Sequence, residues 1–291
     1  GTDTLILDFS WMTQGMFTAD EGGGQFALRT GGNEVRTAYS GVEIFRIATG
    51  SGDDSIMTFA GADTISAGSG NDTINSGSGA DVVDGGAGVD GWVEDLSAER
   101  KSIKLDLTLA TAQVVGGGSA KGFEWLHLTT GKGGDVITTL SGAAFAYNDW
   151  VATGAGKDTV TVGGGFDSVN GGARTDIRVV NFGWEPDSIS NTSDAFRSGP
   201  NTVGVFYGEF ENFNVTTGSG NDSIQTFGGD DTVSTGLGDD SINTGVGKAN
   251  VDGGKGVDLW TADYSASVAN GTIDLANVSN SLLGSTLKNI E

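Results

Sequence analysis

The sequence lacks the residues on which several common protein classes depend. Its 291 residues include no cysteine, two prolines and a single histidine, His127. The lack of cysteine excludes disulfide scaffolds, thiolate zinc sites and cysteine nucleophiles, and one histidine excludes a multi-histidine metal centre. No apolar run approaches the ~18 residues that a membrane-spanning helix needs, so no membrane span is expected.

Basic side chains and large apolar side chains are also scarce. Lys and Arg number 15 against 38 Asp and Glu, which gives a formal net charge of −23. This balance argues against nucleic acid or anionic lipid as a partner, because phosphate binding needs Lys and Arg. Val, Ile, Leu and Phe make up roughly 23% of the chain, just above the ~20% below which charged chains tend to stay unfolded. Something other than a large hydrophobic core must stabilise the fold.

Aspartate and glycine are abundant instead. Asp accounts for 28 of the 38 acidic residues, and the chain has 51 glycines. An acidic helical protein would favour Glu, whereas Asp is typical of turns and metal-binding loops. No stretch combines a 3.6-residue apolar period with helix caps. We therefore expect strands and tight turns nearly throughout.

A nine-residue repeat explains much of this composition. From Thr49 the chain reads TGSGDDSIM, TFAGADTIS, AGSGNDTIN, SGSGADVVD and GGAGVDGWV, and from Thr217 it reads TGSGNDSIQ, TFGGDDTVS, TGLGDDSIN, TGVGKANVD and GGKGVDLWT. Asp occupies the sixth place and an apolar residue the eighth, with Ala249 as an exception. A weaker middle run contains Asp135, Asp158, Asp167 and Asp176, lacks the carboxylate at Ala144 and carries an insertion after Asp135.

A longer period of about 85 residues contains the short one. Similar phrases open the runs (VEIFRIATG, FEWLHLTTG, FENFNVTTG) and close them (VDGWVEDLS, TDIRVVNFG, VDLWTADYS), and the chain begins with TDTLILDFS and ends with NIE. We therefore expect an excised fragment, about three and a half units of a longer polypeptide. The predicted order is a tail of a preceding unit at 1–10, a spacer at 11–48, the first run at 49–93, a spacer at 94–129, the degenerate middle run at 130–179, a spacer at 180–216, the third run at 217–261 and the spacer of a next unit at 262–291.

The nine-residue unit has the chemistry of half a calcium site. Glycines at the first, second and fourth places permit positive φ, so that the backbone can turn tightly and direct its carbonyls inward. Two nonapeptides form one coil of 18 residues, so residues eighteen apart stack and bring two carboxylates together. An all-oxygen cage with ligands at ~2.3–2.6 Å suits Ca²⁺, whereas Mg²⁺ needs a stricter octahedron and zinc prefers nitrogen or sulfur.

GGAGVDGWV and its neighbours resemble the RTX repeat, GGxGxDxUx, of calcium-binding β-rolls. The phrases DLWTADYS, GTIDLA and NIE resemble spacer units of large bacterial proteins exported by type I secretion. The resemblance implies an all-β, right-handed parallel β-roll or β-helix solenoid with strand-rich spacers, exported unfolded and folding on extracellular calcium. In this sequence many first-place glycines are Thr, Ser or Ala.

Pairing residues eighteen apart predicts the metal ligands. The predicted carboxylates are Asp54, Asp63, Asp72, Asp81, Asp90, Asp135, Asp158, Asp167, Asp176, Asp222, Asp231, Asp240 and Asp258. Backbone carbonyls are expected to join them near Gly50, Gly52, Gly68, Gly70, Gly86, Gly88, Gly154, Gly156, Gly172, Gly218, Gly220, Gly236, Gly238, Gly254 and Gly256. We expect on the order of six Ca²⁺ ions, with the poorest occupancy in the middle run, where Asp167 pairs only with Asp149.

Other recurrent residues have two interpretations each. Trp92 and Trp260 occupy the inward apolar place and are expected in the core rather than stacked on a ligand, and His127 is expected on the surface rather than in catalysis. A recurrent glutamate opens each unit and could either ligate a further ion or accept hydrogen bonds at a strand end. The four are Glu43, Glu124, Glu211 and Glu291.

The leading functional hypothesis is a calcium-dependent stalk or scaffold of a secreted or surface bacterial protein, such as an adhesin, a matrix protein or an S-layer-like protein. Without calcium the aspartates repel one another, and each bound ion would offset two charges. No catalytic cluster is evident, so we do not expect an enzyme. Two alternatives remain: recognition of an extracellular polysaccharide or surface protein through the spacers, and a non-catalytic accessory module of a polysaccharide-modifying enzyme such as an alginate epimerase or lyase.

Overall fold

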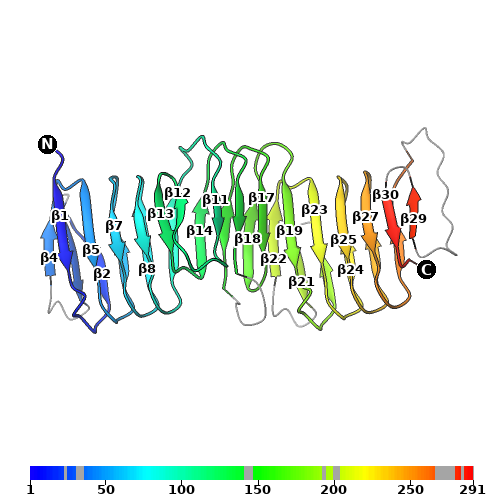
Figure 1. Ribbon diagram of the computed structural model, residues 1–291, viewed down its shortest axis with the longest axis horizontal. Helices are drawn as coiled ribbons and strands as arrows, with labels where there is room; N and C mark the ends of the chain where they lie inside the picture. The colour runs from blue at the N-terminus through cyan, green and yellow to red at the C-terminus, as the bar shows by residue number, and fades with distance from the viewer. Residues whose placement is uncertain are drawn as a thin grey trace. The chain divides into compact units, whose positions relative to one another are not determined.

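The computed structural model describes residues 1–22, 25–30, 36–140, 147–191, 195–198, 204–265, 279–282 and 285–290. Within these ranges the regular secondary structure consists of β-strands (Figure 1). The expected all-β fold, a parallel β-roll, is confirmed. The chain forms two compact units, Gly1–Thr139 and Leu140–Glu291. No helix in the described part of the chain is long and apolar enough to cross a bilayer.

The first unit contains two parallel rows of short strands, each extended by antiparallel strands from a spacer. One row has the order β1 (Thr4–Asp8), β5 (Ile44–Ala48), β7 (Thr64–Ser66), β9 (Val82–Asp84), β13 (Gly118–Lys121) and β12 (Gln113–Val115). The other has the order β14 (Trp125–Thr129), β10 (Gly91–Asp95), β8 (Thr73–Gly77), β6 (Ser55–Met57), β2 (Met16–Gly22), β3 (Gln25–Thr30) and β4 (Arg36–Tyr39). In addition, β11 (Lys104–Asp106) pairs in parallel with β15 (Val136–Thr138).

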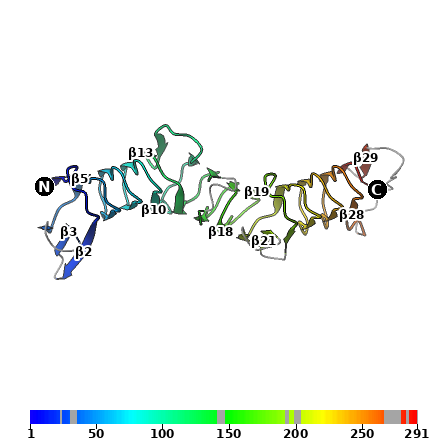
Figure 2. The ribbon, with the colours of Figure 1, turned by 90° about the horizontal axis from the view of Figure 1, so that it is seen from below.

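The second unit repeats this plan. One row has the order β28 (Leu259–Thr261), β26 (Ser241–Asn243), β24 (Ser223–Gln225), β20 (Ile189–Asn191), β21 (Ala195–Ser198), β22 (Gly204–Gly208), β18 (Phe166–Asn170) and β16 (Trp150–Ala152). The facing row has the order β17 (Thr159–Val162), β19 (Ile177–Asn181), β23 (Asn212–Thr216), β25 (Asp231–Ser234), β27 (Ala249–Asp252), β30 (Ser285–Lys288) and β29 (Ser279–Leu282). Within each unit the chain winds back and forth between its two rows (Figure 2).

The strands pair in an eighteen-residue register, as the nine-residue period predicts. Ile56 is level with Ile74, and Ile74 with Trp92, while on the facing row Ile65 is level with Val83. These eighth-place side chains are all buried and form a narrow apolar column. Each turn adds only one aliphatic residue per row, so the core is as thin as the composition suggests.

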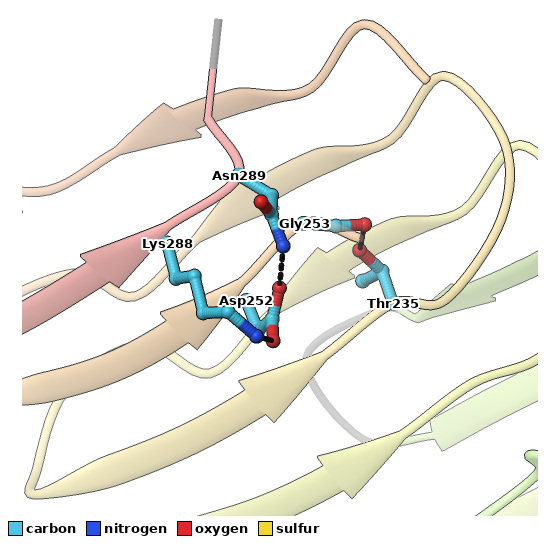
Figure 3. Close-up of polar contacts among 5 residues, drawn as sticks. All are labelled: Thr235, Asp252, Gly253, Lys288 and Asn289. Carbon is cyan, nitrogen blue, oxygen red and sulfur yellow. Dashed lines mark hydrogen bonds and ion pairs between the residues drawn. The ribbon is translucent and has the colours of Figure 1, made fainter. Parts of the chain in front are cut away.

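Buried hydroxyls at the first place of the repeat form a second column. Thr49 Oγ1 donates to the Ala67 carbonyl at 2.8 Å, and Thr235 Oγ1 donates to the Gly253 carbonyl at 2.9 Å (Figure 3). The donor and acceptor are eighteen residues apart in both cases. Threonine in place of the first glycine therefore links successive coils, because its hydroxyl satisfies a buried carbonyl.

The ends of each unit have recurrent backbone features that the sequence analysis did not identify. After each run, an Asx-type turn is formed by Asp8, Asp95, Asn181 or Asp263, whose side chain accepts the N–H of the residue two places on. Before each recurrent glutamate, a residue with positive φ occurs two places earlier: Gly41, Gly122, Glu209 and Asn289. The spacers thus leave and rejoin the roll through the same local geometry.

The spacers pack largely as strands. Two spacer segments alternate apolar and polar residues in sequence: IKLDLTL at 103–109 contains β11, and TIDLANV at 272–278 lies outside the described residues. Met12 and Met16 are buried, whereas Trp11 is 67% exposed. At the other end of the chain, Lys288 Nζ lies 2.8 Å from Asp252 Oδ2 and Asn289 Nδ2 donates to Asp252 Oδ1 at 2.7 Å, joining β30 to β27 (Figure 3).

Candidate metal centres

The sixth-place aspartates form ladders along the edges of the roll. The backbone N–H of Asp54 donates to Asp72 Oδ1 at 2.7 Å, and that of Asp72 donates to Asp90 Oδ1 at 2.8 Å. The other edge has the same bond from Asp63 to Asp81. In the second unit the bonds run from Asp149 to Asp167, Asp158 to Asp176, Asp222 to Asp240 and Asp240 to Asp258, at 2.8–3.0 Å. Each coil therefore holds the next through one carboxylate oxygen.

The recurrent glutamates terminate these ladders. The N–H of Asp90 donates to Glu124 Oε2 at 2.7 Å, and the N–H of Asp176 donates to Glu211 Oε2 at 2.8 Å. Glu43 accepts the N–H of Asp3 in the same way. A hydrogen-bonding role at a strand end is thus confirmed for these three glutamates, while Glu291 lies outside the described residues.

At the start of each run, the first aspartate accepts a backbone N–H from an adjoining segment. Asp54 Oδ1 accepts from Met16, Asp135 Oδ1 from Ile103 and Asp222 Oδ1 from Ile189, at 2.7–2.8 Å. A spacer thus occupies the position of one more coil at both ends of a run.

The second oxygen of most of these carboxylates is buried and has no hydrogen-bond partner in the part of the chain that the structure describes. This holds for Oδ2 of Asp54, Asp63, Asp72, Asp81, Asp90, Asp167, Asp176 and Asp240. A buried charged oxygen without a partner is costly, so native proteins pair such atoms or place a metal ion beside them. In each of these carboxylates, Oδ2 is therefore available to bind a cation.

Burial changes the ionisation of these groups. It raises the pKa of Asp72 to about 7, with the charges of Asp54 and Asp90 acting in the same direction. Burial also raises the pKa of Asp81 and Asp90 to about 6. Anionic carboxylates in this setting favour a nearby cation, because a positive charge offsets both desolvation and mutual repulsion.

Three predicted ligands have a different environment. Threonine hydroxyls donate to Oδ2 of Asp135, Asp222 and Asp231, from Thr130, Thr217 and Thr226 respectively. Asp231 has Ala249 as its neighbour eighteen residues on, and the N–H of Ala249 donates instead to Ser285 Oγ at 2.9 Å. The N–H of Asp231, which would meet a carboxylate at position 249, donates to the Lys248 carbonyl at 2.9 Å, and Ser285 provides the acceptor for the next coil.

The glycine turns place carbonyl oxygens next to the carboxylates. Gly68 has φ +98° and Gly86 has φ +104°, and a Cβ at either would overlap the carbonyl oxygen of the glycine eighteen residues earlier. The same stacking joins Gly52, Gly70 and Gly88, and it recurs at Gly154 with Gly172, at Gly218, Gly236 and Gly254, and at Gly220, Gly238 and Gly256. Only glycine permits both this backbone conformation and this close approach.

The available donors are therefore oxygens alone, which suits Ca²⁺. No group of three or more His, Cys, Asp or Glu side chains gathers to hold a metal ion within the described ranges. The carboxylates occur as stacked pairs, so backbone carbonyls must complete any coordination sphere. The residues present thus fit a calcium ion held between two turns.

Other assignments from the sequence can now be compared with the structure. Trp92 is buried, as expected, and its Nε1 donates to Ser76 Oγ at 3.2 Å, whereas Trp260 is half-buried with Nε1 3.0 Å from Thr244 Oγ1. His127 is exposed, in agreement with its expected surface position.

The buried charged residues that the sequence analysis missed include Glu94 and Arg178. Glu94 is buried and accepts a hydrogen bond from Ser76, and Arg178 is fully buried at an eighth place. Each differs from the residue type usual at its place in the repeat. That difference is the one sequence feature that could have marked them as unusual.

Comparison with known families agrees with this geometry. The model of the RTX calcium-binding nonapeptide repeat (4 copies) matches residues 46–74, 57–91, 144–177, 214–242 and 225–259. The chain carries RTX calcium-binding repeats. The matches fall in all three runs and include the degenerate middle one. No curated protein matches the chain significantly. The RTX repeats therefore supply a calcium-binding module with a parallel β-roll fold.

Proposed function

We propose that this RTX segment is a calcium-dependent structural stalk or scaffold of a secreted or surface bacterial protein. The observation that carries the proposal is the row of buried aspartate oxygens without hydrogen-bond partners along the described edges of the roll. The chain also has a net charge of −23, which would oppose a compact metal-free state. Calcium binding would offset this repulsion and add its free energy to folding.

The proposed ions lie between aspartates eighteen residues apart. Six pairs have both carboxylates in register: Asp54 with Asp72, Asp72 with Asp90, Asp63 with Asp81, Asp158 with Asp176, Asp222 with Asp240 and Asp240 with Asp258. Carbonyl oxygens of the stacked glycines complete each site. Six ions would bring the net charge of −23 to roughly −11.

An extracellular location follows from the same chemistry, as part of the proposal. A chain that folds only when it meets millimolar calcium can leave a cell unfolded through a type I exporter. The absence of cysteine from the sequence suits such a route, because no cross-link can form before export. The whole segment is then a non-catalytic structural part of a longer protein, and its partners are a surface polysaccharide or surface proteins.

The test is far-UV circular dichroism of the chain in calcium-free buffer and at millimolar calcium. We expect a disordered spectrum without calcium, a β-rich spectrum with it, and no comparable effect of magnesium. An unchanged β-rich spectrum after complete calcium removal would contradict the proposal.

A cavity in the second unit supports glycan recognition as a second candidate. It measures about 410 Å³ and is lined by Tyr207, Phe210, Phe213 and Phe227 together with Glu209 and Glu211. Aromatic faces with adjacent carboxylates are typical of sites that stack a sugar ring and bind its hydroxyls. A glycan array with the calcium-loaded chain tests this candidate. Binding lost in F227A supports recognition at the cavity, and the absence of any bound glycan contradicts it.

A further inference from the structure

A second ladder of hydrogen bonds runs beside the aspartate ladder, at the fifth place of the repeat. The backbone N–H of Asn71 donates to Asp53 Oδ1 at 2.7 Å, and that of Val89 donates to Asn71 Oδ1 at 2.9 Å. In the third run the same bonds join Asp239 to Asn221 and Val257 to Asp239, at 2.8–3.0 Å. Donor and acceptor are eighteen residues apart in every case. We call this row the outer ladder, because its Asp and Asn side chains are exposed.

The outer ladder runs in the opposite direction to the aspartate ladder. In one and the same turn, the N–H of Asn71 donates to Asp53 Oδ1 in the preceding coil, and the N–H of Asp72 donates to Asp90 Oδ1 in the following coil. Two successive N–H groups are thus held in opposite directions along the roll. The turn between them has its backbone orientation fixed from both sides.

The outer ladder fixes the direction of a carbonyl that belongs to the proposed calcium sites. The N–H of Asn71 shares one planar, trans peptide unit with the Gly70 carbonyl, so the two groups point in opposite directions. Because the N–H is held toward the preceding coil, the carbonyl points toward the following one, where a Cβ on Gly88 would overlap its oxygen. The same arrangement directs the Gly238 carbonyl. Both carbonyls are among those expected to bind calcium.

The outer ladder accompanies some of the proposed calcium sites and not others. It is present beside four aspartate pairs: Asp54–Asp72, Asp72–Asp90, Asp222–Asp240 and Asp240–Asp258. At the Asp63–Asp81 and Asp158–Asp176 pairs, the fifth-place residue that would accept the bond is Ala62 or Lys157. Neither side chain carries an oxygen, so the carbonyl at these two levels lacks this restraint.

We propose that the fifth-place Asp and Asn residues are positioning residues for calcium, which set the affinity of the adjacent site by orienting a glycine carbonyl. Their Oδ1 already accepts a backbone N–H, so they act through the turn rather than as ligands. The inference deepens the proposed function and rests on it, since it assumes ions between the paired aspartates. It divides the six proposed sites into four that hold calcium tightly and two that hold it less tightly.

The first experiment measures calcium release from the loaded chain, by stopped-flow mixing with an excess of a fluorescent calcium chelator. We expect four ions in a slow phase and two in a fast phase for the wild type. N71A removes the acceptor for Val89, so one ion should move to the fast phase, with release about three- to tenfold faster. N71D keeps an acceptor oxygen and should retain the slow phase, and S69A, at an exposed side chain of the same turn, controls for the loss of a polar group.

The second experiment adds the missing acceptor. A62N places an amide oxygen where it can accept the N–H of Ala80, so one ion should move from the fast phase to the slow one. A62Q, whose amide lies one methylene farther from the backbone, is the matched control and should resemble the wild type. Amide hydrogen exchange in the calcium-loaded chain provides a readout independent of calcium release: exchange at Val89 should be faster in N71A, and exchange at Ala80 slower in A62N.

The outcomes separate this inference from the proposed function. Unchanged release phases in either N71A or A62N would overturn the inference, as would a loss of thermal stability in N71A without faster calcium release. Each of these results leaves the proposed function intact. A wild-type chain without bound calcium would overturn the proposed function, and the inference with it.

Discussion

The backbone N–H of Asp90 donates to Glu124 Oε2 at 2.7 Å across 34 residues of sequence. Within a run the same N–H would meet an aspartate eighteen residues on, as Asp72 does with Asp90. The glutamate is one methylene longer, and it reaches the ladder from the start of β14 after the chain has passed through a spacer. A spacer therefore replaces one coil of the roll without interrupting the column of carboxylates.

Removal of this glutamate should weaken the junction between run and spacer. We expect E124A to lower the free energy of unfolding at saturating calcium by about 1–2 kcal/mol, because the buried N–H of Asp90 loses a charged acceptor. E124Q retains an acceptor oxygen and is the matched control, with a smaller loss. Urea unfolding followed by circular dichroism measures both. Equal stability of E124A and wild type would contradict the role of Glu124 in the ladder.

The glycine at the second place of a repeat is required by stacking as well as by backbone conformation. Gly68 and Gly41 both have positive φ, but only at Gly68 would a Cβ overlap the carbonyl oxygen of another coil. G41A should cost about 1 kcal/mol, from the conformation alone. G68A should cost more than about 3 kcal/mol and reduce the number of bound calcium ions, since the turn must shift. Similar costs for the two variants in thermal unfolding would contradict the stacking.

Arg174 should be a point of backbone strain in the middle run. It is exposed and has φ +109° at the fourth place, where the regular repeats have glycine. R174G should stabilise the calcium-loaded chain by about 1 kcal/mol, because glycine adopts this φ without a steric penalty. R100G, at another exposed arginine, controls for the loss of charge and should be neutral or slightly destabilising. A lower Tm in R174G than in R100G would refute the strain.

The metal-free chain should be more ordered in mild acid than at neutral pH. Burial in the folded state raises the pKa of Asp72 to about 7 and of Asp81 and Asp90 to about 6, above the ~3.9 of an unfolded aspartate. The stability that protonation contributes is fully present below about pH 4 and is lost as the pH rises through 6 to 7. Protons thus substitute in part for calcium.

Circular dichroism in buffer stripped of calcium measures this dependence directly. The β signal should be larger at pH 5 than at pH 7.5, and millimolar calcium should remove most of the difference. D72N, which cannot ionise at that position, should show a weaker pH dependence than the wild type. A β signal that grows from pH 5 to pH 7.5 without calcium would contradict the prediction.

The nine-residue period made the regular part of the fold predictable. Because each coil has a fixed length, the spacing of Asp54, Asp72 and Asp90 sets the register, the inward column at Ile56 and Ile74, and the pairing of carboxylates. These features depend on local backbone geometry that recurs in every repeat, so sequence alone determines them.

The remainder depends on contacts that no period encodes. The antiparallel pairing of β12 with β13 joins residues of one spacer to each other and to the end of a run. Arg178 is fully buried at an eighth place that the period reserves for apolar residues. The residues with positive φ before each glutamate include Gly122, Glu209 and Asn289, whose side chains share no chemical property that would mark the position. Such features depend on how the coils and spacers pack against one another, which the nine-residue pattern does not encode.

The account depends most directly on calcium being the partner of the aspartate ladders. A single titration that records bound calcium per chain and the β signal together tests this claim. We predict that the two rise in step and level off near six ions, the number of aspartate pairs in regular ladders. A β signal that is complete before calcium binds, or a chain that reaches its full β content with no calcium bound, would contradict the account.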